Sequence, residues 1–144
     1  MYKIAVAGAT GAVGREMIKI LEERDFPLEK LVLLASERSK GKTLPFKGKE
    51  VEVEVLAERS FEDIDIALFS AGSSTVKEHA GRIIDDGAVI VDNSSAFRYQ
   101  QEIPLVVPKS ILMLWKNTGD SWPILTAARF NWSWFWLPFI ASTV

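Results

Sequence analysis

Residues 2–14 read YKIAVAGATGAVG, and this stretch decides the fold. Residues 2–7 form a short apolar run rich in Ile and Val, which predicts a buried strand. Gly8, Gly11 and Gly14 follow it at the mouth of an amphipathic segment. Glycines there allow a tight turn and a close approach of the backbone to an anion, which the free N–H groups of a helix N-terminus attract. The stretch predicts a strand, a turn and a helix that hold the diphosphate of a dinucleotide.

The next residues complete a repeating unit. Residues 12–24 have helical spacing, with Val13 and Met17 on the apolar face, and Pro27 ends the pattern. Residues 31–35 are a second buried strand. Strand, helix and strand within about 35 residues form a βαβ unit, in which the two strands are parallel and the crossover is right-handed.

The alternation of strands and helices continues to about residue 92. Strand 51–55 alternates Val with Glu and is expected near an edge of the sheet, with one face in water. Ser73 or Ser74 is expected to cap a helix over 75–85. The remaining predicted strands are 65–70 and 88–91. This order predicts an α/β fold with a Rossmann-like, doubly wound, mostly parallel sheet.

Composition limits the function. The chain has 144 residues, 25% charged residues and a net charge of −2, so nothing favours a nucleic acid or a membrane as partner. It has 0 Cys, which excludes a disulfide, a thiolate metal site and a cysteine nucleophile. No metal-ligand cluster is visible, and the lone His79 is expected to be partly exposed. Without a signal-peptide pattern or an apolar span of about 20 residues, we expect a cytoplasmic protein.

The end of the second strand bears on which dinucleotide binds. A carboxylate there normally accepts a hydrogen bond from the 2′-hydroxyl of NAD. Residues 35–42 read ASERSKGK, and Ser36, Arg38, Ser39 and Lys40 suit a 2′-phosphate instead. A carboxylate that pointed inward from position 37 would still suit NAD, and a solvated polar loop is the third reading. We favour NADP.

Two more strand ends reach the same rim of the sheet. Residues 69–74, FSAGSS, bring small side chains, and residues 92–98, DNSSAFR, bring a cluster of donors that ends in a guanidinium. Arg98 is suited to bind a phosphate or a carboxylate, although a surface arginine on a loop would look the same.

The motifs AVAGATGAVG, ASERSKGK, FSAG and VDNSSAFR, in this order, resemble the aspartate-semialdehyde dehydrogenases over residues 1–108. The resemblance implies an NADP-dependent oxidoreductase of lysine, threonine and methionine biosynthesis. Aspartyl phosphate would be reduced to aspartate semialdehyde with release of phosphate, in a homo-oligomer with a second, catalytic domain. A related acyl-phosphate reductase of arginine synthesis and a non-catalytic NADP-binding module are the alternatives.

The resemblance also assigns residues. Thr10 to Val13 would hold the diphosphate, Arg38 and Ser39 the 2′-phosphate, and Arg98 the phosphate co-substrate. The residues expected at the cofactor are Gly8, Thr10, Gly11, Ala12, Val13, Gly14, Ser36, Arg38, Ser39, Ser70, Ala71, Gly72, Asn93, Ser94 and Ser95. The last six would line the nicotinamide side.

The chain departs from this family after Pro108. Similar enzymes attack the acyl group with a cysteine in an NPNCST segment, because a thiolate forms the thioacyl intermediate. Residues 109–144 contain no cysteine and are Trp-rich and irregular. We therefore expect residues 1–108 to be the NADP-binding domain and 109–144 an aberrant tail. Such a truncated form would bind NADP weakly and have no activity.

The genetic code offers an origin for the tail. When the last base of each codon is joined to the first two of the next, Trp122–Pro123 forces alanine. The codons through Asn131 then permit NPNCSTIQ, and Asn131–Trp132 forces leucine. We infer one lost base near the codons of Pro108 and Lys109. The alternative is a true Trp-rich segment for a lipid interface or a partner, which Pro138 and the low basic charge disfavour.

Overall fold

The first strand lies in the middle of a sheet because it is apolar on both faces. In the computed structural model, which describes residues 1–57, 60–99, 105–106 and 124–127, Ile4 to Ala7 are at most 1% exposed. The described helices are α1 (Ala12–Glu23), η1 (Glu37–Ser39, a 3-10 turn) and α2 (Ser73–Asp85). The described strands are β1 (Tyr2–Ala7), β2 (Leu28–Ala35), β3 (Thr43–Phe46), β4 (Lys49–Val55), β5 (Ile66–Phe69), β6 (Val89–Asp92), β7 (Leu105–Val106) and β8 (Ile124–Ala127).

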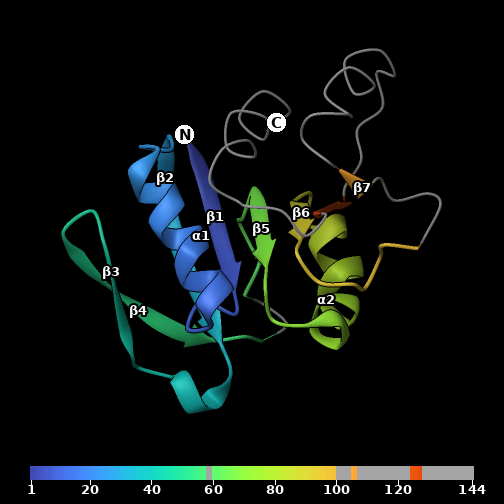
Figure 1. Cartoon of the computed structure of the whole chain (residues 1–144), viewed down its shortest axis with the longest axis horizontal. Coiled ribbons are helices and arrows are strands. Elements are labelled where there is room, and N and C mark those ends of the chain that lie inside the picture. The colour runs from blue at the N-terminus through green and yellow to red at the C-terminus, as the bar shows by residue number, and fades with distance from the viewer. Residues whose placement is uncertain (58–59, 100–104, 107–123, 128–144) are drawn as a thin grey trace.

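These strands form one sheet in the order β3-β4-β2-β1-β5-β6-β8-β7 (Figure 1). Every neighbouring pair is parallel except β3 and β4, so the sheet is mostly parallel, as predicted. The chain runs outward from β1 through β2 to β4 and then returns to β5 on the other side. The order therefore reverses between β1 and β5, and open α/β sheets bind ligands at such a reversal.

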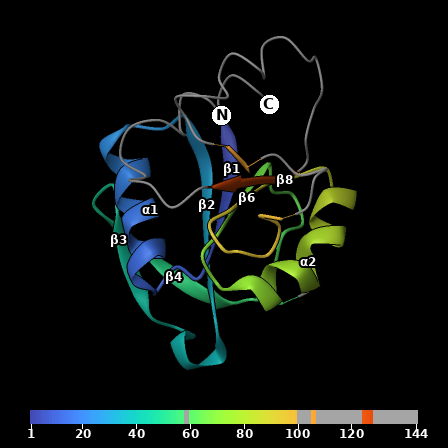
Figure 2. The ribbon, with the colours of Figure 1, turned by 45° about the vertical axis from the view of Figure 1, so that its right-hand side comes forward.

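The two α-helices cover opposite faces of the sheet. Alternate residues of β1 face opposite layers, because side chains alternate along a strand. Ile4 and Val6 belong to a buried cluster with residues of α1, whereas Ala5 and Ala7 belong to a cluster with residues of α2. Figure 2 shows α1 and α2 flanking the strands. The fold is the doubly wound α/β arrangement that the sequence predicts.

The apolar stripe of α1 differs in one residue from the prediction. Val13 is 38% exposed and faces away from the core, whereas Met17, Ile18 and Leu21 are buried. Val13 was wrongly placed on the apolar face: it lies in the first turn of α1 and is exposed. The helix ends at Glu23, and two residues later Asp25 adopts a positive φ of 45°.

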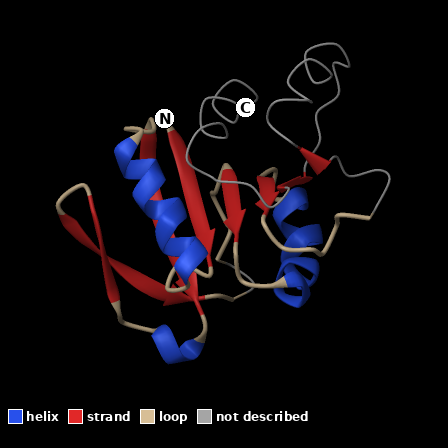
Figure 3. Ribbon diagram, viewed as in Figure 1, coloured by secondary structure: helices blue, strands red, loops and turns tan. Residues whose placement is uncertain are grey.

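A β-hairpin that the sequence reading missed extends the sheet beyond β2. β3 pairs with β4 in antiparallel register, and the turn between them places Lys47 and Gly48 at φ 47° and 74° (Figure 3). Two consecutive positive φ values are typical of the tight turns that favour hairpins. The Lys47 side chain forms an ion pair with Asp25, and its N–H donates to Glu22 Oε1 at 2.7 Å. The hairpin is thus attached to the end of α1, and β4 lies one strand in from the edge.

The start of α2 also differs from the prediction. The helix begins at Ser73, with Gly72 as its N-cap residue at φ 99°, and no side chain caps it. The Ser73 hydroxyl lies 3.1 Å from the Ser95 hydroxyl instead, which links α2 to the segment after β6. The predicted serine cap was wrong because Ser73 is already helical and its side chain is hydrogen-bonded elsewhere.

The predicted tail is partly described. Residues 124–127 lie within the segment predicted to be irregular, yet they form β8, which pairs with β6 in parallel. The predicted boundary at Pro108 and the Trp-rich residues of the tail lie outside the described residues. Among the residues that the structure describes, no helix is long and apolar enough to cross a membrane.

Candidate functional site

The turn between β1 and α1 together with the first three residues of α1, residues 8–14 in all, is called the glycine turn below. Gly8 has φ 86°, and a Cβ there would lie 2.7 Å from Ser70 Oγ and 2.9 Å from the Ala71 nitrogen. A Cβ on Gly14 would lie 2.2 Å from the carbonyl oxygen of Gly8. Neither position has room for a side chain, so the turn packs directly against both α1 and the end of β5. This is the close packing that the sequence predicts for Gly14.

The N-terminus of α1 presents backbone donors at this turn. Gly11 is the N-cap residue, no side chain caps the helix, and no acidic residue lies in the first turn. The Arg15 N–H makes the first helical hydrogen bond, to the Gly11 carbonyl at 3.0 Å. The three amides from Ala12 to Gly14 therefore have no acceptor within the helix. These amides and the helix dipole favour an anion at this point.

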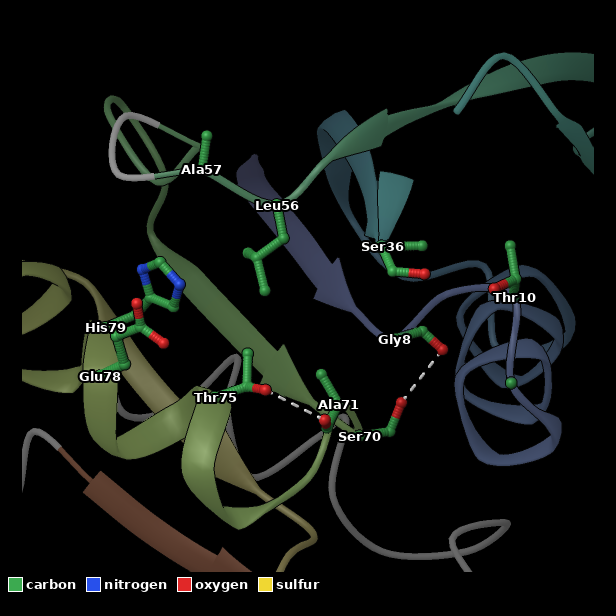
Figure 4. Close-up of a pocket in the computed structure, with 12 residues that line it drawn as sticks. Gly8, Thr10, Ser36, Leu56, Ala57, Ser70, Ala71, Thr75, Glu78 and His79 are labelled. Carbon is green, nitrogen blue, oxygen red and sulfur yellow. Dashed lines mark hydrogen bonds between the residues drawn. The ribbon is translucent and has the colours of Figure 1, made fainter. Parts of the chain in front are cut away.

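The end of β5 holds the glycine turn in place. The Ser70 hydroxyl lies 3.1 Å from the Ala7 carbonyl oxygen and 3.3 Å from that of Gly8, so it donates between the two (Figure 4). The Gly8 N–H donates to the Leu34 carbonyl of β2 at 2.8 Å. Thr75 of α2 donates to the Ala71 carbonyl at 3.2 Å. The ends of β1, β2 and β5 are thus joined at the point where the strand order reverses.

The 3-10 turn η1 follows β2 at the same rim. Ser36 and Arg38 are exposed, whereas Ser39 is 7% exposed. The Ser39 hydroxyl lies 3.2 Å from the hydroxyl of Thr10 in the glycine turn. The structure therefore separates Ser39 from the two exposed residues with which it was grouped.

The segment after β6, residues 93–98, is called the β6 loop below. Asp92 is completely buried and accepts two hydrogen bonds from Ser94, from its N–H and its hydroxyl, both at 2.7 Å. The Arg98 guanidinium folds back and donates from Nη2 to the Asn93 carbonyl at 3.1 Å. Its Nε is buried and makes no hydrogen bond to a described residue. Donors of Ser94 and Arg98 are thus used in hydrogen bonds to Asp92 and to the loop's own backbone.

A cavity of about 630 Å³ opens at the reversal point, between the glycine turn, the ends of β2 and β4, and α2 (Figure 4). Of the predicted site residues, it is lined by Gly8, Thr10, Gly11, Ser36, Ser70 and Ala71. The predicted residues outside its lining are Ala12, Val13, Gly14, Arg38, Ser39, Gly72, Asn93, Ser94, Ser95 and Arg98. The sequence reading thus found one side of the cavity, and the β6 loop lies apart from it.

The other side of the cavity was missed. It consists of Leu56 and Ala57 after β4, Thr75, Glu78 and His79 on α2, and Ala35 at the end of β2. The half-buried His79 packs on Phe61, with ring centroids 5.9 Å apart. Positions 75, 78 and 79 have the spacing of one helix face, which was the available signal. Within the described residues no group of His, Asp and Glu could hold a metal ion.

Comparison with known proteins identifies the family. Residues 3–111 match the family model described as semialdehyde dehydrogenase, NAD binding domain. An aspartate-semialdehyde dehydrogenase of Aquifex aeolicus is 60% identical over 109 residues, which are 75% of this chain and 32% of that relative. The enzyme of that name from Legionella pneumophila is 52% identical over 107 residues, 74% of this chain and 31% of the relative.

Solved structures agree with the sequence match. The structure of aspartate semialdehyde dehydrogenase II of Vibrio cholerae, complexed with ASA, superposes with a TM-score of 0.78 at 42% identity. The match covers 89% of this chain and 42% of that one. The chain spans about a third of the length of the curated relatives that it matches. The family model covers the strand, the turn and the helix N-terminus that form the candidate site. The chain therefore belongs to the semialdehyde dehydrogenase family through its NAD-binding domain.

Proposed function

We propose that this chain carries the NADP-binding domain of an aspartate-semialdehyde dehydrogenase. That enzyme reduces aspartyl phosphate to aspartate semialdehyde with release of phosphate, and the nicotinamide supplies the hydride. The observation that carries the proposal is the uncapped N-terminus of α1, which meets a turn too tight for side chains at the rim of a cavity of about 630 Å³. A diphosphate fits this arrangement because backbone amides and the helix dipole supply its hydrogen bonds and countercharge.

The 2′-phosphate of NADP is proposed to bind at the exposed part of η1. Ser36 lines the cavity, and the Arg38 guanidinium belongs to an exposed residue two positions further on. A guanidinium binds a phosphate through paired charge-assisted hydrogen bonds, which a 2′-hydroxyl cannot match. Glu37 is exposed in the same turn and would favour NAD only if it replaced Arg38 at the ribose.

The nicotinamide side is proposed to lie toward Ser70, Ala71 and Gly72, with residues 93–95 beyond them. The hydroxyl contact between Ser73 and Ser95 supports this, because it ties the β6 loop to the start of α2 directly after Gly72. In the same proposal Arg98 contributes to binding of the phosphate co-substrate through its remaining guanidinium donors.

Residues 109–144 are proposed to be encoded out of frame and to replace the start of the catalytic domain. The family model ends at residue 111, close to the inferred lost base. Because the chain has 0 Cys, it lacks the nucleophile of the proposed reaction, and we expect this chain alone to be inactive. Phosphate-dependent reduction of NADP by the purified chain with the semialdehyde would contradict this. A nucleotide sequence in frame with an intact relative across codons 108–109 would contradict the frameshift.

The cofactor proposal is tested by calorimetric titration of the full chain with NADP and NAD. Arg38→Ala should weaken NADP binding by about tenfold or more, since hydrogen bonds to charged groups contribute about 1.5–3 kcal/mol. NAD affinity should stay unchanged, because NAD has no 2′-phosphate. Lys19→Ala is the matched control: this exposed cation on α1 pairs with Glu23 and lies outside the cavity lining. Equal loss of both dinucleotides, or no loss of NADP, would remove Arg38 from the proposed site.

A further inference from the structure

The wall of the cavity formed by α2 is not needed to hold the diphosphate or the 2′-phosphate. It consists of Thr75, Glu78 and His79, which project from one face of the helix (Figure 4). Leu56 and Ala57, which follow β4, line the cavity as well. Besides the groups proposed to bind phosphates, the cavity thus has a part with apolar side chains from one segment and polar side chains from another.

The covalent structure of the cofactor decides which part of it reaches the α2 wall. This inference rests on the proposed function, in which the diphosphate lies at the glycine turn and the 2′-phosphate at Ser36 and Arg38. The 2′-phosphate and the adenine are substituents of the same ribose, so the base must lie within one sugar of Ser36. Ser36 and the α2 wall line the same cavity, whereas Gly72 and residues 93–95, on the proposed nicotinamide side, are outside its lining. The base is therefore the part of the dinucleotide left for the α2 wall.

Glu78 is the side chain of the α2 wall with acceptors to spare. The Thr75 hydroxyl donates to the Ala71 carbonyl at 3.2 Å. The His79 ring packs on Phe61, with ring centroids 5.9 Å apart. The Glu78 side chain makes no hydrogen bond or ion pair with another residue that the structure describes. An ionised carboxylate accepts hydrogen bonds at both oxygens and donates none.

We infer that Glu78 is a specificity-determining residue that accepts a hydrogen bond from the exocyclic amino group of the adenine. Leu56 and Ala57 suit the apolar face of the ring, and the carboxylate suits its polar edge. Adenine carries a hydrogen-bond donor at N6. Hypoxanthine, its deaminated analogue, carries an oxygen at that position, which would meet the carboxylate with no proton between them. The site then prefers adenine dinucleotides, with or without a 2′-phosphate, to their hypoxanthine analogues.

Calorimetric titration of the full chain with NADP and with nicotinamide hypoxanthine dinucleotide phosphate tests this. The parent should bind NADP about tenfold more tightly, the lower end of the effect of a hydrogen bond to a charged group, because Glu78 is exposed to water. Glu78→Gln should bring the ratio of the two affinities close to one, because an amide can accept from N6 or donate to O6. It should do so chiefly through tighter binding of the hypoxanthine dinucleotide. Glu78→Ala should also lower the ratio, but through weaker binding of NADP.

Glu50→Gln is the matched control, because it removes the same charge from an exposed residue outside the cavity lining. It should leave the ratio of the two affinities as in the parent. Because Glu78 is exposed, both of its substitutions should also leave the melting temperature unchanged, which circular dichroism measures.

The outcomes separate this inference from the function beneath it. Equal affinity of the parent for the two dinucleotides, or an unchanged ratio in Glu78→Gln, would show that Glu78 does not read the base. Equal weakening of both dinucleotides in Glu78→Gln would reduce its role to the charge of the wall, which also overturns the inference. A parent chain that binds neither dinucleotide contradicts the proposed function itself.

Discussion

The glycine turn follows β1 and the β6 loop follows β6, two strands of one sheet with β5 between them. Different kinds of contact fix the conformations of these two segments. The glycine turn is shaped mainly by close backbone packing: Gly8 and Gly14 leave no space for a Cβ, and the free donors in its helical part are main-chain amides. The β6 loop is shaped by side chains, with the buried Asp92 accepting both hydrogen bonds of Ser94. A backbone turn keeps its donors available for a ligand, whereas a side-chain turn consumes part of them.

The largest expected effect breaks the glycine turn. Gly14→Ala places a Cβ 2.2 Å from the Gly8 carbonyl oxygen, and backbone on both sides prevents relief. We expect a loss of about 3 kcal/mol in the free energy of unfolding, measured by urea denaturation. Gly81→Ala is the matched control. A Cβ there meets nothing within 4 Å inside α2, so it should stabilise by about 1 kcal/mol. Equal effects of the two substitutions would show that packing does not constrain the turn.

The next effect tests the β6 loop. Asp92→Ala leaves the N–H and the hydroxyl of Ser94 without their acceptor, and we expect a loss of about 2 kcal/mol in unfolding free energy. Asp86→Ala, at the exposed C-cap of α2, is the control and should change stability by less than about 0.5 kcal/mol. If Asp92→Ala were as mild as the control, the loop would not depend on its buried carboxylate.

The smallest expected effect concerns the start of β1, which lies at the other end of that strand from the glycine turn. Lys3 Nζ lies 2.7 Å from Asp63 Oδ1, and this hydrogen bond lowers the pKa of the Asp63 carboxyl and raises the pKa of Lys3. The ionised pair stabilises the fold above the ordinary carboxyl value of 3.8 and below the ordinary lysine value of 10.5.

Asp63→Asn should therefore lower the melting temperature slightly at neutral pH. The difference from the parent should shrink as pH falls through the lowered pKa of Asp63, and again as pH rises through the raised pKa of Lys3. Melts followed across this range measure it, with NADP affinity at neutral pH unchanged. A difference that is constant with pH would rule out the ion pair as its cause. The effect is small because both side chains are partly or largely exposed.

Sequence reading found the elements whose signal is local. The apolar run of β1, the glycines after it and the spacing of α1 all agree, so their bounds came out nearly as observed. It missed β3, whose four residues include Pro45 and whose turn has no Asn or Asp. The sequence reading also wrongly predicted a serine cap for α2. The Ser73 hydroxyl contacts Ser95 instead, and that partner lies 22 residues away, beyond the reach of a local pattern.

The site was predictable to the extent that backbone defines it. Gly8, Thr10 and Gly11 follow from strand, turn and helix order, and they do line the cavity. The burial of Ser39 beneath Thr10 depends on how η1 packs, which no local pattern contains. The wall made by Leu56 and His79 joins β4 to α2, and only the tertiary fold brings them together.

The Gly8 carbonyl oxygen is contacted by the turn after β1, by the residue after β5 and by the first turn of α1. It accepts from the Gly11 N–H at 3.0 Å and from the Ser70 hydroxyl at 3.3 Å, and Gly14 packs against it. A shift of α1 relative to β5 would break both hydrogen bonds, so we expect these elements to move together. Any change in the width of the cavity is then expected at the wall that includes Ala57 and His79. Hydrogen exchange should accordingly be slowest at the joined elements and fastest on that wall.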